Sequence, residues 1–173
     1  MPKSIPVDPD YFRQPGKLAF PDIPLHAYNT SFEDERARHG DRVLIDVLRH
    51  MMLVREFETM LGSFKAKGSY QDITYAYKGP AHLSLGQEGA AVGAALSLTP
   101  EDHIFGSHRS HGEFIAKGLS AIAKLSPQDL TRIMETHQKG NLLRAVEAHI
   151  PVSSVTNLAE NFLLFGLLAE IFM

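Results

Sequence analysis

The 173-residue sequence contains no cysteine, which excludes disulfides, thiolate metal sites, iron–sulfur clusters and cysteine nucleophiles. It also has no cluster of five like charges, and 17 basic against 20 acidic residues give a net charge of -3. This balance predicts neither a nucleic-acid-binding surface nor an arm that binds anionic membranes.

Long apolar runs are also scarce. The longest run, residues 158–173, is interrupted by Glu160, Asn161 and Glu170, so the sequence predicts no membrane span. The N-terminal residues lack the apolar stretch of a signal peptide. We therefore expect a cytoplasmic location.

The remaining composition is typical of one globular domain, with 44% hydrophobic and 21% charged residues. Six of the ten prolines fall within the first 24 residues, where no hydrophobic periodicity is present. We therefore divide the chain into an irregular, proline-rich leader, residues 1–30, and a folded part, residues 31–173.

Hydrophobic spacing predicts helices through most of the folded part. Apolar residues recur every three or four positions from Leu44 to Phe64, which predicts a long amphipathic helix from Asp41 to near Gly68. Capping and breaker residues predict three further helices, at residues 87–98, at 110–117 before Gly118, and at 127–137 after Ser126.

Strand signals are weak by comparison. Residues 69–84 form a predicted loop with three tyrosines, and residues 102–105 are the one predicted strand. The chain should therefore be predominantly α-helical, with at most one or two short strands.

A last helix should begin near Asn157, and it is apolar on nearly every face. Such a helix belongs in the interior of a larger protein, so we expect the chain to be truncated and to associate through this segment. The alternative is a central helix of a small bundle.

Chemically active side chains concentrate in residues 80–93 and 102–112. Gly86 permits a turn into a helix, and His108, Arg109 and His111 stand before another helix start. Basic side chains beside a helix N-terminus are typical of a phosphate site. A surface ion pair for Arg109 and structural histidines remain alternatives, as does a zinc site made by His103, His108 and His111, which the spacing disfavours.

Three segments in order along the chain carry a family resemblance: 52–58 (MLVREFE), 82–88 (HLSLGQE) and 108–112 (HRSHG). Together they resemble the alpha-type subunit of the thiamine diphosphate-dependent 2-oxoacid dehydrogenase E1 component. The resemblance covers about residues 41–120. It implies that the chain is the N-terminal part of an α/β thiamine diphosphate-binding fold.

By this resemblance His82 and His111 would be catalytic, and Gln87, His108 and Arg109 would bind the cofactor. Members of the family usually have tyrosine where His108 stands. The implied reaction is oxidative decarboxylation of a 2-oxo acid, with acyl transfer to a lipoyl-bearing E2 partner. The implied assembly is an oligomer that includes a beta-type E1 part, separate or fused.

The resemblance also implies thiamine diphosphate and Mg²⁺ in the complete enzyme. However, the family's Gly-Asp-Gly and Asn-Asn magnesium motif is missing from this sequence, and no metal ligands are predicted. We therefore expect the chain alone to be inactive and to bind no cofactor tightly. Another thiamine diphosphate enzyme, such as a transketolase-like one, and a non-catalytic helical interaction module or remnant are the alternatives.

Overall fold

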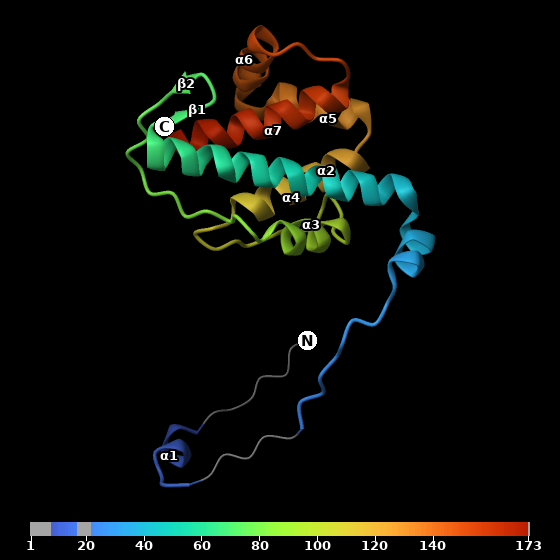
Figure 1. The fold of residues 1–173 in the computed structure, drawn as a ribbon, viewed down its shortest axis with the longest axis vertical. Helices are drawn as coiled ribbons and strands as arrows, with labels where there is room; N and C mark the ends of the chain where they lie inside the picture. The colour runs from blue at the N-terminus through green and yellow to red at the C-terminus, as the bar shows by residue number, and fades with distance from the viewer. Residues whose placement is uncertain (1–7, 17–21, 173) are drawn as a thin grey trace.

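A computed structural model describes residues 8–16 and 22–172 of the chain. In these residues the protein is predominantly helical with one two-stranded hairpin, which confirms the predicted fold class (Figure 1). Residues 22–30 run as an extended stretch away from the helical body. In chain order the elements are α1 (Pro9–Phe12), α2 (Phe32–Lys67), β1 (Ser69–Tyr70), β2 (Ile73–Thr74), α3 (Glu88–Leu96), α4 (His111–Lys124), α5 (Pro127–Thr136), the 3₁₀ turn η1 (His137–Gly140), α6 (Asn141–His149) and α7 (Val155–Phe172).

Helix α2 begins earlier than the predicted Asp41. Ser31 and Asp34 form a capping box, in which the Ser31 hydroxyl accepts from the Asp34 amide at 3.1 Å and the Asp34 carboxylate accepts from the Ser31 amide at 3.2 Å. The helix then kinks at Gly40, whose φ of +79° is non-helical. Its predicted end is confirmed, because Gly68 adopts the left-handed conformation that closes a helix.

The predicted loop after α2 contains the hairpin. Strands β1 and β2 pair antiparallel, with Ser69 opposite Thr74 and Tyr70 opposite Ile73. The strand predicted at residues 102–105 is wrong, because this segment has no regular secondary structure and pairs with no strand in the described part of the chain. A strand requires a neighbour for its backbone hydrogen bonds, and this segment has none there.

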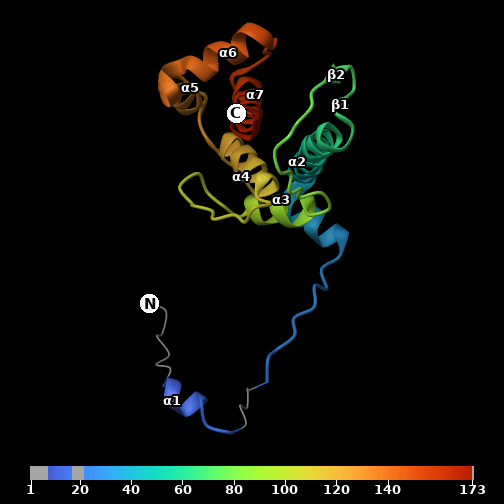
Figure 2. The same ribbon diagram turned by 90° about the vertical axis from the view of Figure 1, so that its left-hand side faces the viewer.

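Helices α2, α3 and α4 surround the main core, and α7 lies across α4 (Figure 2). The predicted end of α4 at Gly118 is wrong, because the helix continues to Lys124. Gly118 instead faces α7, where a methyl group at its position would overlap the side chain of Leu163. The buried core residues around α4 are Val54, Phe57, Leu61, Val92, Ala95, Ile115, Ala116 and Leu119.

The C-terminal helices form a second, smaller core. The predicted start of α5 is confirmed, since Pro127 opens the helix and the Ser126 hydroxyl accepts from the Asp129 amide at 3.1 Å. Helix α6 was not predicted. Helix α7 starts close to the predicted position and packs against α4, α5 and α6.

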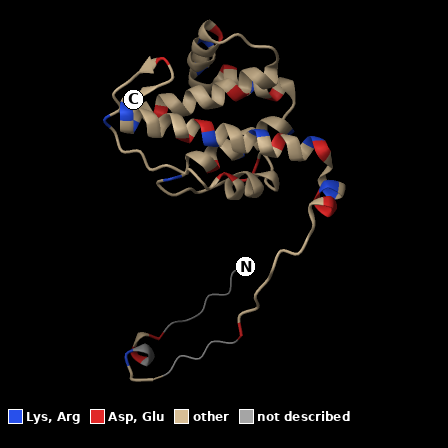
Figure 3. Cartoon of the chain, viewed as in Figure 1, with Lys and Arg blue, Asp and Glu red and all other residues tan. Residues whose placement is uncertain are grey.

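Helix α7 contains few charged side chains, as Figure 3 shows. By length and composition it meets the criteria for a membrane span, contrary to the sequence-based expectation. In the fold, however, Ala159 is buried and most other α7 side chains are half-buried against neighbouring helices. Glu160 also forms an ion pair with Arg49 of α2. Ala159 is the one buried residue of α7 in the described part of the chain, so α7 is not enclosed as the central helix of a small bundle would be.

Candidate functional site

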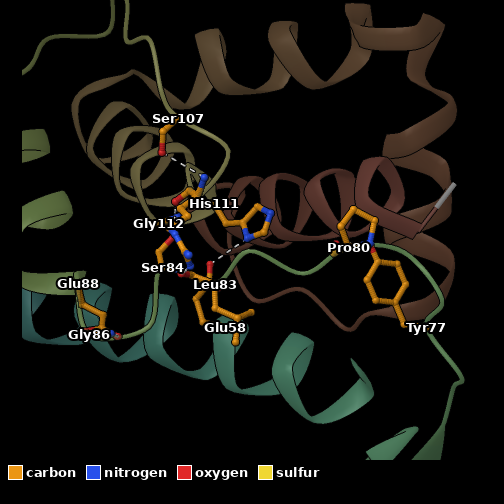
Figure 4. A network of polar contacts seen from close by, with 11 residues as sticks. Glu58, Tyr77, Pro80, Leu83, Ser84, Gly86, Glu88, Ser107, His111 and Gly112 are labelled. Carbon is orange, nitrogen blue, oxygen red and sulfur yellow. Dashed lines mark hydrogen bonds and ion pairs between the residues drawn. The ribbon is translucent and has the colours of Figure 1, made fainter. Parts of the chain in front are cut away.

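The three segments that carry the family resemblance meet at the buried carboxylate of Glu58. Glu58 lies on α2 and is 0% exposed. Its Oε2 accepts a hydrogen bond from the Ser84 amide at 3.0 Å, and its Oε1 lies 3.1 Å from Nδ1 of His111 (Figure 4). One carboxylate therefore connects α2, the turn before α3 and the first residue of α4.

The hydroxyl of Ser84 forms a second connection between these segments. Ser84 is 1% exposed; its Oγ donates to the carbonyl of Arg109 at 2.5 Å and accepts from the amide of Gly112 at 3.2 Å. The amides of a first helical turn have no partner within the helix, and Ser110, at the N-cap of α4, makes no side-chain capping bond. Ser84 thus caps α4 from a distant part of the chain.

The segments approach one another so closely at position 112 that a side chain there would need its neighbours to move by a few tenths of an ångström. A Cβ atom there would lie 3.2 Å from Cβ of Ser84 and 3.4 Å from Cγ1 of Val54. Gly112 is itself buried. The last glycine of the third segment therefore permits direct packing of α4 on the second.

An ion pair between the exposed Arg55 and the buried Glu88 connects the first two segments a second time. Arg55 Nε lies 2.6 Å from Glu88 Oε1, and Arg55 Nη2 lies 2.9 Å from Glu88 Oε2. Gly86, whose φ is +91°, donates its amide to Glu88 Oε1 at 2.9 Å. The hydrogen bond from Arg55 is the main cause that lowers the pKa of Glu88 to about 2, so this carboxylate is ionised at neutral pH.

Four of the predicted site residues lie around this network. The rings of His82 and His108 are both exposed and meet edge to face, with centroids 4.9 Å apart. Arg109 is exposed, and its Nη1 donates to the carbonyl of Leu83 at 3.0 Å. His111 is mostly buried, with a side chain 20% exposed.

Gln87 has a different environment. Its backbone amide donates to the Ser84 carbonyl at 2.9 Å, and Gln87 is among the residues that line a hollow of about 380 Å³ between α3 and α4. Ile104, Phe105, Glu113 and Lys117 line the same hollow. The predicted grouping of Gln87 with His108 and Arg109 in one binding site stays a prediction.

The donors in this region fit the diphosphate part of a thiamine diphosphate molecule. A diphosphate needs positive charge and N–H donors. The Arg109 guanidinium and the His82 and His108 rings can supply them, close to the N-terminus of the 14-residue helix α4. Magnesium needs carboxylate or carbonyl oxygens, and within residues 8–16 and 22–172 no group of three or more acidic or histidine side chains is arranged to hold a metal.

The sequence interpretation assigned no role to the residues at the centre of this arrangement. All of these residues lie inside the motif segments: Arg55, Glu58, Ser84, Glu88 and Gly112. Their position in those segments is the one sequence feature that could have identified them. A sequence does not show, however, that Glu58, Ser84 and Glu88 are buried polar residues that bond one another's segments.

Comparisons with known proteins match a stretch of the chain that contains all three motif segments. The family model described as dehydrogenase E1 component matches residues 49–162. The alpha subunit of acetoin:2,6-dichlorophenolindophenol oxidoreductase from Cupriavidus necator is 38% identical over 82 residues, which is 47% of this chain and 22% of that protein. The pyruvate dehydrogenase E1 component subunit alpha of Rhizobium meliloti is 36% identical over 73 residues, 42% of this chain and 19% of that protein.

A eukaryotic relative matches over a longer stretch. The mitochondrial pyruvate dehydrogenase E1 component subunit alpha of Saccharomyces cerevisiae is 30% identical over 111 residues, which is 64% of this chain and 24% of that protein. The chain thus spans about a fifth to a quarter of the length of the curated relatives it matches. No solved structure matches the chain.

Proposed function

Because the chain belongs to the dehydrogenase E1 component family, we propose that it forms part of the alpha-type subunit of a thiamine diphosphate-dependent 2-oxoacid dehydrogenase. The observation that carries this proposal is the meeting of all three motif segments at Glu58 and Ser84. Their contacts place Arg109 and His111 at the start of α4, where anionic groups are stabilised.

In the proposed enzyme a 2-oxo acid is decarboxylated oxidatively, and the acyl group passes to a lipoyl-bearing E2 protein. Thiamine diphosphate supplies the carbanion chemistry when it is bound. Arg109 would hold the diphosphate by charge-assisted hydrogen bonds, with His82, His108 and Gln87 as further contacts. His111 acts at the reacting groups through the ring nitrogen that faces away from Glu58.

The remaining parts of the proposed site come from outside this chain. They are the Mg²⁺ ligands and a beta-type E1 part, within an oligomeric assembly. The names of the relatives support pyruvate or acetoin as substrates to test first. Cytoplasmic location, and the failure of the chain alone to bind the cofactor tightly, stay predictions.

The activity is tested on the full-length natural protein that contains this sequence, together with its beta-type partner. The assay follows reduction of 2,6-dichlorophenolindophenol with pyruvate or acetoin as donor, with and without thiamine diphosphate and Mg²⁺. Cofactor-dependent reduction with pyruvate supports the proposal. Reduction with acetoin alone would support a related thiamine diphosphate-dependent acetoin dehydrogenase instead, because acetoin has no carboxyl group to lose. Reduction with a ketose phosphate donor but neither of these would favour a transketolase-like enzyme, and no cofactor-dependent reaction would favour a non-catalytic module.

The role of Arg109 is tested by Arg109→Lys, which keeps the charge but removes the planar fork that holds two phosphate oxygens. We expect the apparent cofactor affinity to fall by about 10- to 150-fold, equivalent to about 1.5–3 kcal/mol for charged hydrogen bonds. The matched control is Arg132→Lys, because Arg132 is an exposed arginine of α5 that pairs with Asp129. Equal cofactor affinities for the two variants would remove Arg109 from the site.

A further inference from the structure

Glu58 makes two hydrogen bonds, one to a partner that can only donate and one to a partner that can donate or accept. The Ser84 amide can only donate, so Oε2 of Glu58 must accept that bond. The ring nitrogen Nδ1 of His111 can donate or accept, depending on which ring nitrogen carries the hydrogen. The tautomer of His111 is therefore set by the chemical group at Glu58 Oε1.

A carboxylate oxygen without a hydrogen can only accept, so with Glu58 in its carboxylate form His111 donates from Nδ1 across the 3.1 Å contact. Its Nε2 then has a free lone pair, and Figure 4 shows this nitrogen pointing away from Glu58. The edge-to-face contact between the Phe57 and His111 rings, with centroids 6.3 Å apart, adds a second constraint on the orientation of the imidazole.

We propose that Glu58 is a positioning residue that holds His111 in the Nδ1–H tautomer, so that Nε2 is the hydrogen-bond or proton acceptor of the site. The active role of His111 rests on the proposed function, but its tautomer does not. A carboxylate that orients a histidine through Nδ1 is the arrangement that fixes the general base in Ser-His-Asp triads.

The test is Glu58→Gln, which keeps the size of the side chain but replaces one oxygen with an NH₂ group. The Ser84 amide still needs an acceptor, so the single amide oxygen must face Ser84 and the NH₂ group must face His111. Nδ1 of His111 would then have to accept. We therefore expect the predominant tautomer of His111 to invert from Nδ1–H to Nε2–H.

The measurement is ¹⁵N NMR of the histidine ring nitrogens at a pH above the ordinary titration range of imidazole, because protonated and bare ring nitrogens have well-separated shifts. The signals of His111 are assigned by their loss in His111→Gln. The matched control is Glu56→Gln, because Glu56 lies on the same helix but is exposed, and this change should leave the tautomer as in the parent protein.

A parent protein whose His111 carries its hydrogen on Nε2 would overturn the proposal, and so would a folded Glu58→Gln variant that keeps the Nδ1–H tautomer. The parent measurement decides the question even if the variant does not fold. Since the readout needs no cofactor, a protein that lacks dehydrogenase activity but shows the expected tautomers would contradict the proposed function and leave this inference standing.

Discussion

Removal of the Ser84 hydroxyl tests whether α4 is capped by a residue from another part of the chain. In Ser84→Ala the backbone amide of Ser84 still donates to Glu58, so the contact between Glu58 and His111 is retained. The change removes only the two bonds of Oγ, to the Arg109 carbonyl and the Gly112 amide. Any loss of stability therefore reports on these two bonds.

The magnitude depends on the surroundings of each freed group. The Gly112 amide belongs to a buried residue and would have no partner, which costs about 1–3 kcal/mol. Arg109 is exposed, so we assign its carbonyl the ordinary net value of a hydrogen bond, about 0.5–1.5 kcal/mol. We expect Ser84→Ala to lower the free energy of unfolding by about 1.5–4.5 kcal/mol, a large part of the 5–15 kcal/mol typical of a domain.

The assay is urea unfolding followed by far-ultraviolet circular dichroism, with the midpoint compared at equal slope. The matched control is Ser110→Ala, which removes the hydroxyl from the local N-cap position that makes no capping bond and should change stability by less than about 0.5 kcal/mol. Equal midpoints for the two variants would refute the assignment of the cap to Ser84.

Two further predictions concern the ion pair and the core. Because Arg55 lowers the pKa of Glu88 to about 2 from an ordinary value of 4.5, the ionised pair stabilises the fold above about pH 4.5 and this contribution is lost as the pH falls toward about 2. The difference in urea midpoint between the parent and Glu88→Gln should therefore be widest above about pH 5 and should shrink in acid; a constant difference would contradict this. In the core, Ile115→Ala should cost about 2–5 kcal/mol, since Ile115 is 0% exposed, whereas its half-exposed neighbour in Phe114→Ala should change stability far less. Similar urea midpoints for these two variants would show that Ile115 is not in the core.

Features that depend on a few neighbouring residues were predictable from the sequence. Helix α5 begins where Ser126 caps the amide three residues later and Pro127 occupies the first helical position. Helix α2 ends at Gly68, which adopts the left-handed conformation. The predominantly helical character follows in the same way from hydrophobic spacing. The three motif segments indicated the family, which the match over residues 49–162 confirms.

Features that depend on distant contacts were predicted wrongly or not at all. Gly118 was predicted to end a helix, but it lies inside α4. Its missing side chain allows α7 to pack directly over it. Residues 102–105 have the composition of a strand, yet pairing requires a neighbouring strand that the described residues do not provide. Glycine and apolar residues have several structural uses, and the choice among them is made by the element that packs against them.

The sequence by itself determined the predominantly helical character, the cysteine-free chemistry and the family to which the chain belongs. Only the tertiary structure decided that Glu58 pairs with His111, 53 positions away, and that Ser84 caps α4 at Gly112, 28 positions away. A buried polar atom must find a hydrogen-bond partner or lose the free energy of its hydration. Which partner it finds depends on how the helices pack, and no short-range pattern in the sequence records that packing.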